Sequence, residues 1–329
     1  MRNKKFNIWF LCLTFLSSLI YGGCIARNAH AQAPADQQKV TAGKEAPLVY
    51  FTADISPAGL MAVYEALGVE AKGKVAVKVH TGEPGNPHFV QPSLMQNLVK
   101  KVNGTFVECN TVYGRRGNSA SHYQVVKDHG FTAVAPVVIM DEKGEMRLPV
   151  VGGKRLKENF VGERFKEFDF HIVLSHFKGH PSGGFGGAIK NLSIGYASSE
   201  GKSLIHSAGK SRKTRWQSSD QNAFLESMAE AAKTIVDANK GRILFINVMN
   251  HLSVDCDCLS RPAKPTMADI GILASLDPVA LDAACIDLVW AAPDSKDLIK
   301  RIESKNGLLT LEHAEKIGLG SKNYRLIKL

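Results

Sequence analysis

Histidines and lysines gather around a group of glycines in one stretch of the sequence, residues 176–206. Imidazole rings transfer protons close to neutral pH, and lysine ammonium groups hold negative charge. Backbone N–H groups of a glycine-rich loop can also face an anion. A single histidine would favour a structural role, but so many convergent groups favour a small-molecule site. The residues are His176, Lys178, His180, Gly183, Gly184, Gly186, Gly187, Lys190 and His206.

The elements around this stretch are expected to hold it in place. Residues 168–177 (FDFHIVLSHF) form an apolar run that predicts a buried strand, and a helix is expected after the glycines. A strand, a glycine-rich loop and a helix are how α/β folds build anion sites. We predict His180, Lys190 and His206 as the reacting residues. The predicted substrate contacts of this stretch are Lys178, Gly184, Gly186, Gly187 and, ranked last, His176.

A second candidate group is Lys78 and His80, which end the apolar run KVAVKVH, with Glu83 three positions later. Two cationic side chains at a strand end can clamp a carboxylate or a phosphate. The glycines and proline that follow indicate a turn, so a solvent-facing turn is an equal alternative. We predict Lys78 and His80 as substrate-binding residues.

The third group is the pair Cys256 and Cys258, which flanks Asp257. Two thiolates at this spacing can bind one soft metal ion, with Cys109 or His251 completing the site. We predict Cys256, Cys258 and Cys109 as metal ligands; the acidic side chains of the loop could ligate or attract a cation. A disulfide is the alternative, because four cysteines remain beyond residue 31. The fourth, Cys285, lies in an apolar helical segment and is expected to belong to the core.

Strand-like and helix-like segments alternate along the chain, which predicts an α/β fold with a mostly parallel sheet and flanking helices. Unusual polar residues follow the predicted strands. Because ligands bind at the carboxyl ends of strands in such sheets, these loops are expected to meet in one cleft. The predicted strands are 47–52, 74–80, 104–110, 134–140, 168–177, 242–248 and 269–274. The predicted helices are 57–67, 92–102, 121–129, 223–239 and 278–290, the first capped by Ser56 and the last by Asp277.

The N-terminus reads as a processing segment. A basic start and an apolar run at 7–21 predict a signal peptide over 1–31, with Ala29-His30-Ala31 as the cleavage site. A lipoprotein signal ending at residue 23, with Cys24 lipidated, is the alternative. A polar linker, 32–46, precedes the domain 47–329. We therefore expect an exported protein, periplasmic or in the cell envelope, that meets a membrane only through its signal or a lipid anchor.

The composition and charge limit the kinds of molecule that this protein is expected to bind. The 329 residues are 44% hydrophobic and 22% charged, as in an ordinary globular protein. The net charge of +10 includes four positive charges within 1–31, which leaves +6 for the remainder. The basic residues are spread out and no RNA- or DNA-binding signature occurs, so a small anionic molecule is expected rather than nucleic acid. Neither a G-x-S-x-G elbow nor a P-loop is present.

Five stretches resemble the DUF362 family, a domain of unknown function. They are KVAVKVHTGEPG, GTFVECNTVYG, LSHFKGHPSGGFGGAIKNLSIGYAS, INVMNHLSVDCDC and DIGILASLDPVALDAACIDLV. Members are often labelled iron–sulfur or ferredoxin-like, but this chain has no C-x-x-C-x-x-C run. The spacing of His180, Lys190 and His206 around GGFGG also resembles the N-terminal domain of nickel-pincer lactate racemases. That likeness implies proton-transfer or cofactor contacts for the two histidines and a cofactor or phosphate contact for the lysine.

Taken together, these features predict acid/base chemistry on a small anionic substrate, with His180 and His206 as the acid/base pair and a metal ion or other cofactor assisting. An iron–sulfur redox protein that uses the Cys-Asp-Cys loop is one alternative. A non-catalytic binding protein for an anionic solute is another. Metal content distinguishes the first alternative from the predicted acid/base enzyme, and the absence of turnover distinguishes the second from it.

Overall fold

The structure is a computed structural model that describes residues 45–213 and 219–329. The predicted signal segment, Cys24 and most of the predicted linker lie outside the described residues. The described residues from Glu45 onward form one unit. None of the described helices is both long and apolar enough to cross a membrane.

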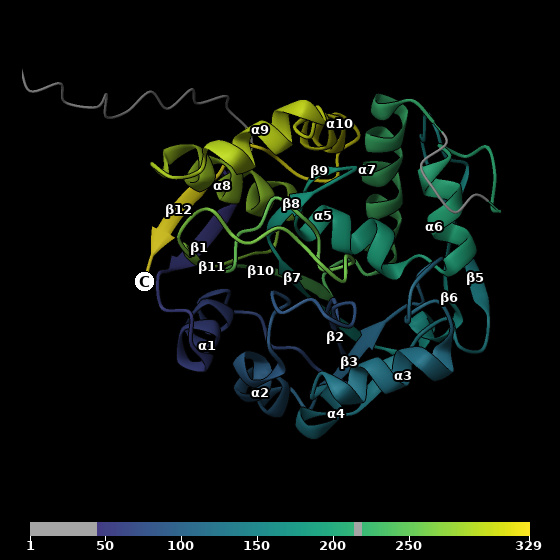
Figure 1. The fold of residues 1–329 in the computed structure, drawn as a ribbon, viewed down its shortest axis with the longest axis horizontal. Coiled ribbons are helices and arrows are strands. Elements are labelled where there is room, and N and C mark those ends of the chain that lie inside the picture. Colours follow the sequence, from purple (N-terminus) through teal and green to yellow (C-terminus); the bar gives the residue numbers. More distant parts are fainter. Residues whose placement is uncertain (1–44, 214–218) are drawn as a thin grey trace, which may run out of the picture. The chain divides into compact units, whose positions relative to one another are not determined.

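An eight-stranded sheet forms the centre of this unit (Figure 1). Its strands are β1 (Leu48–Thr52), β2 (Val75–Lys78), β3 (Thr105–Glu108), β4 (Val137–Ile139), β7 (Phe170–His176), β10 (Ile243–Met249), β11 (Gly271–Ser275) and β12 (Arg325–Lys328). They lie in the order β12-β1-β11-β10-β7-β2-β3-β4. Only β11 runs against its neighbours; the other pairs are parallel. The predicted α/β fold with a mostly parallel sheet is therefore confirmed.

The strand order reverses between β2 and β7. From β2 the chain moves outward through β3 to β4 at one edge, and from β7 it moves the opposite way to β10. β2 and β7 are neighbours, with Val75 opposite Phe170 and Lys78 opposite Val173. The loops that leave such neighbours diverge to opposite faces of the sheet. A crevice at their carboxyl ends follows from this reversal.

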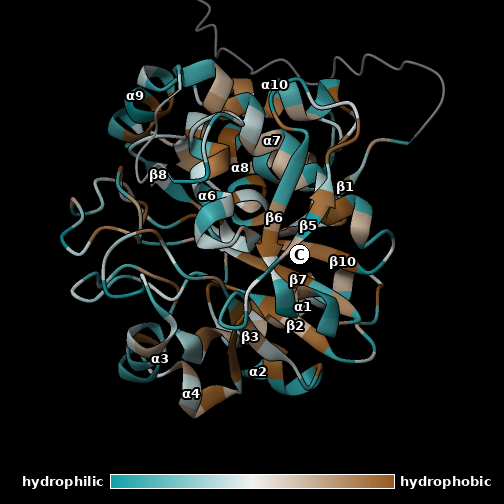
Figure 2. Cartoon of the chain, turned by 90° about the vertical axis from the view of Figure 1, so that its right-hand side faces the viewer, coloured by the Kyte–Doolittle hydropathy of each residue, from teal (hydrophilic) through white to brown (hydrophobic). Residues whose placement is uncertain are grey.

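Helices cover both faces of the sheet (Figure 1). One face packs against α1 (Pro57–Ala66), α2 (Pro92–Lys101), α3 (Ser119–Asp128) and α4 (Phe131–Val134). The other packs against α5 (Ala188–Lys190), α7 (Gln221–Ala238), α8 (Pro278–Ala291), α9 (Lys296–Ser304) and α10 (Leu309–Lys316). Figure 2 shows hydrophobic strands at the centre and hydrophilic residues on the outer helices. Alternate strand residues thus enter two separate cores.

Local signals placed the ends of the five predicted helices to within two residues. The hydroxyl of Ser56 accepts hydrogen bonds from the N–H groups of Ala58 and Gly59, both at 3.2 Å. The Asp277 carboxylate accepts from Val279 at 2.8 Å and Ala280 at 2.9 Å. These are N-caps, which satisfy donors that the first helical turn leaves free. Both predicted caps are confirmed.

Several elements had no counterpart in the sequence analysis. They are α4, the hairpin of β5 (Glu145–Pro149) and β6 (Glu158–Gly162), the short pair β8 (Lys178–His180) and β9 (Gly184–Gly186), and α9, α10 and β12. The short strands lie inside segments that read as loops because of their glycines and charged residues. Their pairing comes from tertiary contacts, which local patterns do not record.

Candidate functional site

A cavity of about 740 Å³ opens at the carboxyl ends of β2, β3, β7 and β10, where the strand order reverses. Loops that are far apart in the sequence meet there, as the predicted sheet required. Nine of the predicted site residues line it. They are His80, His176, Lys178, His180, Gly186, Gly187, Lys190, His206 and Cys258.

Other predicted residues lie behind the cavity wall. The Lys78 side chain is fully buried, and its Nζ donates to Val79 O at 2.7 Å and to Asn191 Oδ1 at 2.8 Å. Burial lowers the pKa of Lys78 to about 8, although the charge of Glu108 works against this. Lys78 thus holds the π-helical turn Asn191–Gly195 that forms part of the wall. Gly184 packs against backbone at Ile302 and Gly307.

Three cationic residues that line the cavity, Arg115, Arg116 and Lys202, were missed. Lys202 lines the cavity from α6 (Ser199–His206), one helical turn before His206. Residues four apart lie on the same side of a helix, so this spacing was a usable signal once the helix was recognised. The Lys202 ammonium group donates to Ala197 O at 2.6 Å, and it has no ion pair among the described residues. Burial lowers its pKa against the influence of nearby acidic groups.

His176 and Lys178 are both bonded to one buried carboxylate. The ring of His176 is buried, with Nδ1 at 2.9 Å from Asp257 Oδ1 and Nε2 at 2.6 Å from Asn250 O. Both partners only accept, so a ring that bonds to both of them donates from both of its nitrogens. The Lys178 ammonium group lies 3.1 Å from Asp257 Oδ2. The Asp257 carboxylate is thus already bonded to His176 and Lys178, and its predicted cation-attracting role does not fit these partners.

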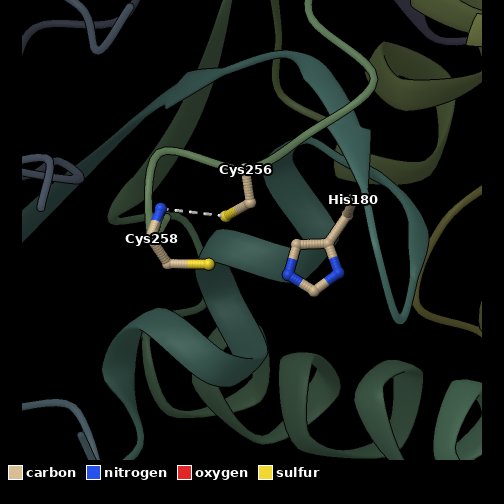
Figure 3. A group of neighbouring side chains, drawn as sticks. All are labelled: His180, Cys256 and Cys258. Carbon is tan, nitrogen blue, oxygen red and sulfur yellow. Dashed lines mark hydrogen bonds between the residues drawn. The ribbon is translucent and has the colours of Figure 1, made fainter. Parts of the chain in front are cut away.

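His180 is oriented by its own turn. Its Nδ1 accepts from the N–H groups of Ser182 at 3.1 Å and Gly183 at 2.9 Å. The neutral ring therefore carries its proton on Nε2. Burial, together with the charge of Lys190, lowers the pKa of His180 to about 4. Figure 3 shows the ring turned toward the sulfurs of Cys256 and Cys258, so the N–H of Nε2 faces them.

The sulfurs and this ring form one group, whose ligand-type atoms all lie within 4.8 Å of one another. Burial opposes ionisation of Cys256, but a hydrogen bond from Cys258 and the charges of Lys190 and His180 hold its pKa well below the usual range. Cys258, which gives that hydrogen bond, has a raised pKa. The pair thus keeps one thiol proton and one negative charge.

The family model described as a domain of unknown function, DUF362, matches residues 75–287, more than half of the chain. This chain belongs to the DUF362 family. No curated protein matches it.

Two solved structures are similar to this DUF362 chain, and the chain spans about half the length of each. One is the lactate racemase apoprotein from Thermoanaerobacterium thermosaccharolyticum, with 18% identity, a TM-score of 0.38, and 60% of this chain and 50% of that chain covered. The other is a Thermotoga maritima protein, with 14% identity, a TM-score of 0.41, and coverages of 79% and 58%. Likenesses at this level assign no reaction.

The Cys/His group of this DUF362 protein could hold a metal ion by proximity, but its donor set fits one poorly. A histidine that binds metal through Nε2 carries its proton on Nδ1 and donates it to an acceptor. Nδ1 of His180 instead faces two N–H donors. The two sulfurs alone remain, whereas an iron–sulfur cluster takes four cysteine ligands.

The remaining cysteines do not complete a ligand set. Cys109 is fully buried on the far side of the wall, where its Sγ donates to Tyr196 O at 3.2 Å. Burial raises its pKa to about 12. Its predicted role as a third ligand is therefore not supported by its position. Cys285 lies in the core, as expected, and all four cysteines of the described residues are free thiols.

The glycine loop is held by a carboxylate that the sequence analysis did not select. Asp282, in α8, accepts from the N–H groups of Ala188 and Ile189 at 2.7 and 3.0 Å. A Cβ at Gly187 would lie 2.3 Å from Asp282 Oδ1, a distance that forces a displacement. A Cβ at Gly186 would make ordinary contacts, the nearest at 3.4 Å.

We expect Gly187→Ala to lower the free energy of unfolding by about 1–3 kcal/mol, because it overpacks a fixed buried carboxylate. Gly186→Ala is the matched control one residue away and should change it by less than about 0.5 kcal/mol. Urea unfolding of both variants measures the difference. Equal losses would show that Asp282 moves aside and does not fix the loop.

Proposed function

We propose that this protein binds a small anionic molecule in the cavity and performs acid/base chemistry on it. The observation that carries the proposal is the charge of the lining. Its carboxylates, Glu83 and Glu108, are both paired with buried Arg116, at 3.0 and 3.2 Å. Among the described residues, Lys190 and Lys202 have no carboxylate partner. The unpaired charge of the cavity is therefore positive, and it favours an anion.

Lys190 is the best-placed anion contact. It is the last residue of α5, the short helix after the glycine loop, and it lines the cavity and is only partly buried. No hydrogen bond or ion pair of its ammonium group occurs in the described parts of the chain, so binding an anion would break no existing bond. A charge-assisted hydrogen bond of this kind contributes about 1.5–3 kcal/mol.

His206 is the best-placed base. Its ring stacks on Phe224, with centroids 4.7 Å apart, and it lines the cavity. Its Nδ1 is buried and has no partner among the described residues. Burial, with the nearby charges of His180 and Lys190, lowers the pKa of His206 to about 3, so the ring is neutral near pH 7 but a weak base while the cavity holds no anion. An anion bound at Lys190 would offset part of this effect.

His180 completes the acid/base pair from the opposite loop. Its Nε2–H is the only proton that the neutral ring can donate, because Nδ1 is occupied by two backbone amides. We propose that His206 removes a proton next to a carboxylate and that His180 returns one. The location that goes with this proposal, outside the cytoplasm, is supported by the N-terminal sequence alone.

The test incubates the full-length protein in D₂O with a panel of small carboxylates and 2-hydroxycarboxylates. We expect exchange of a hydrogen next to a carboxylate in one of them, followed by NMR. His206→Ala should reduce the exchange by roughly 10²–10⁴-fold. Lys190→Gln should weaken binding about tenfold to a hundredfold, and Lys101→Gln, on the exposed side of α2, should not. Binding of a member without exchange would support the non-catalytic alternative; neither binding nor exchange would refute the proposal.

A further inference from the structure

The loop that carries Cys256 and Cys258 presents one sulfur to the cavity and keeps the other behind it. Cys258 is partly exposed and lines the cavity, whereas Cys256 is 1% exposed. The backbone N–H of Cys258 points at Cys256 Sγ, at 3.4 Å (Figure 3). This is the arrangement that an attacking thiol and a resolving thiol require, since the first must meet a ligand and the second must reach the first.

The loop is also held firmly at both flanks. Ser253 O accepts from Gly179 N at 2.8 Å, and Cys256 O and Leu259 O accept from Asn86 Nδ2 at 3.3 and 2.8 Å. A Cβ at Gly179 would lie 2.3 Å from Val254 O, so a glycine is needed for this close approach. The two sulfurs are therefore kept together beside His180.

The surroundings of the pair favour a thiolate. The Nε2–H of His180 faces the sulfurs, and the ammonium group of Lys190 lies close enough for its charge to act on both cysteines. A hydrogen-bond donor and a cation stabilise a negative sulfur, and the thiolate is the form that attacks a disulfide. The same positive charge would draw an anionic reactant into the cavity.

We propose that Cys256 and Cys258 form a dithiol–disulfide couple that opens onto the cavity and exchanges with small disulfides that carry carboxylates. This inference shares Lys190 and His180 with the acid/base proposal but assigns a different reaction, because it uses sulfurs that the acid/base reaction leaves untouched.

The exchange balances without a further reactant. In the resting pair the proton is on Cys258, so the reaction begins with its transfer to Cys256, against the resting preference of the pair. The Cys258 thiolate then attacks one sulfur of the bound disulfide, which releases the first product as a thiolate. That product then takes the proton of Cys256. The Cys256 thiolate attacks the Cys258 sulfur, forms the intramolecular disulfide and releases the second product as a thiolate. Two electrons pass from the dithiol to the bound disulfide.

The test treats the reduced full-length protein with oxidised glutathione, quenches it with acid and maps each thiol by alkylation and mass spectrometry. We expect the wild type to form the Cys256–Cys258 disulfide. Cys256→Ser should stop at a glutathione adduct on Cys258, because the resolving thiol is absent. Cys258→Ser should form no adduct, because Cys256 is buried. Cys109 and Cys285, both buried in the same molecule, are the internal controls and should stay reduced.

A neutral reactant, hydroxyethyl disulfide, tests the preference for anions. Lys190→Gln should slow the reaction with oxidised glutathione about tenfold or more and leave that with hydroxyethyl disulfide nearly unchanged. The proposal is overturned if Cys256→Ser forms no adduct while folded, or if Cys109 reacts as fast as Cys258. It is also overturned if a stoichiometric metal ion blocks both thiols in the protein as isolated. Failure of the D₂O exchange would leave this result unaffected.

Discussion

Replacing Asp257 with asparagine is expected to lower the free energy of unfolding by about 3–5 kcal/mol. The Asp257 side chain is 2% exposed and lies between two buried groups, the ring of His176 at 2.9 Å and the ammonium group of Lys178 at 3.1 Å. Asparagine keeps the size of the side chain but removes its charge, so the buried ammonium group of Lys178 loses its counter-ion. Urea unfolding at neutral pH measures the loss.

The matched control is Asp255→Asn, two residues away in the same loop. Asp255 is partly exposed and pairs with Arg301 at 3.3 Å, so its loss should cost about 1 kcal/mol or less. Comparable losses in the two variants would contradict the assignment of Asp257 as the anchor of the loop.

The loss should also depend on pH in one direction. Burial opposes the charge of Asp257, but His176 and Lys178 outweigh it and hold the pKa of the carboxyl well below its usual range. A carboxyl pKa that is lower in the folded than in the unfolded state stabilises the fold at pH values above the unfolded-state pKa, about 4. This stabilisation disappears as pH falls through the folded-state pKa. The difference between the wild type and Asp257→Asn should therefore be constant above about pH 5 and shrink below pH 4.

Most of the fold could be predicted from the sequence, because the patterns that indicate strands and helices are local. Apolar runs, caps and turn residues placed the strands and helices, and the alternation of the two implied parallel pairing. Once the sheet was parallel, the loops after its strands had to meet at one edge. The cavity therefore formed where the residues around His180 and His80 were expected to converge.

The roles of the individual side chains depended on partners that no local pattern records. Asp257 is 81 residues from His176, and Lys78 is 113 residues from Asn191. In the sequence Asp257 reads as a cation ligand and Lys78 as an anion clamp, because each is charged and follows a strand. In the fold each of the two side chains is instead bonded to a buried partner. Burial and pairing decide such roles, and both come from the tertiary structure.

A second large effect is expected at Arg116, which the sequence analysis did not select. Its guanidinium group is fully buried, with Nε donating to Glu83 Oε2 at 3.0 Å and Nη1 donating to Glu108 Oε1 at 3.2 Å. These three residues join the loops after β2 and β3, both of which line the cavity. Arg116→Met leaves two buried carboxylates without their partner, and we expect it to lower the free energy of unfolding by about 3–5 kcal/mol.

The pH dependence of Arg116→Met should have a different cause from that of Asp257→Asn, because here a carboxyl pKa is raised in the variant. In the wild type, burial opposes the charge of Glu108, but Arg116, His80 and His122 hold the pKa of that carboxyl well below its usual range. Without Arg116, burial should raise this pKa above the unfolded value of about 4.3. The folded variant then binds the extra proton, so its stability rises as pH falls, and its deficit should be smaller at pH 5 than at pH 7.

The matched control is Arg115→Met. Arg115 is the exposed neighbour of Arg116, and its backbone N–H would still donate to Glu83, so this change should alter the stability by less than about 0.5 kcal/mol. A deficit that does not change between the two pH values would mean that the carboxylates find water when Arg116 is removed, and that the two loops are not held by this buried pair.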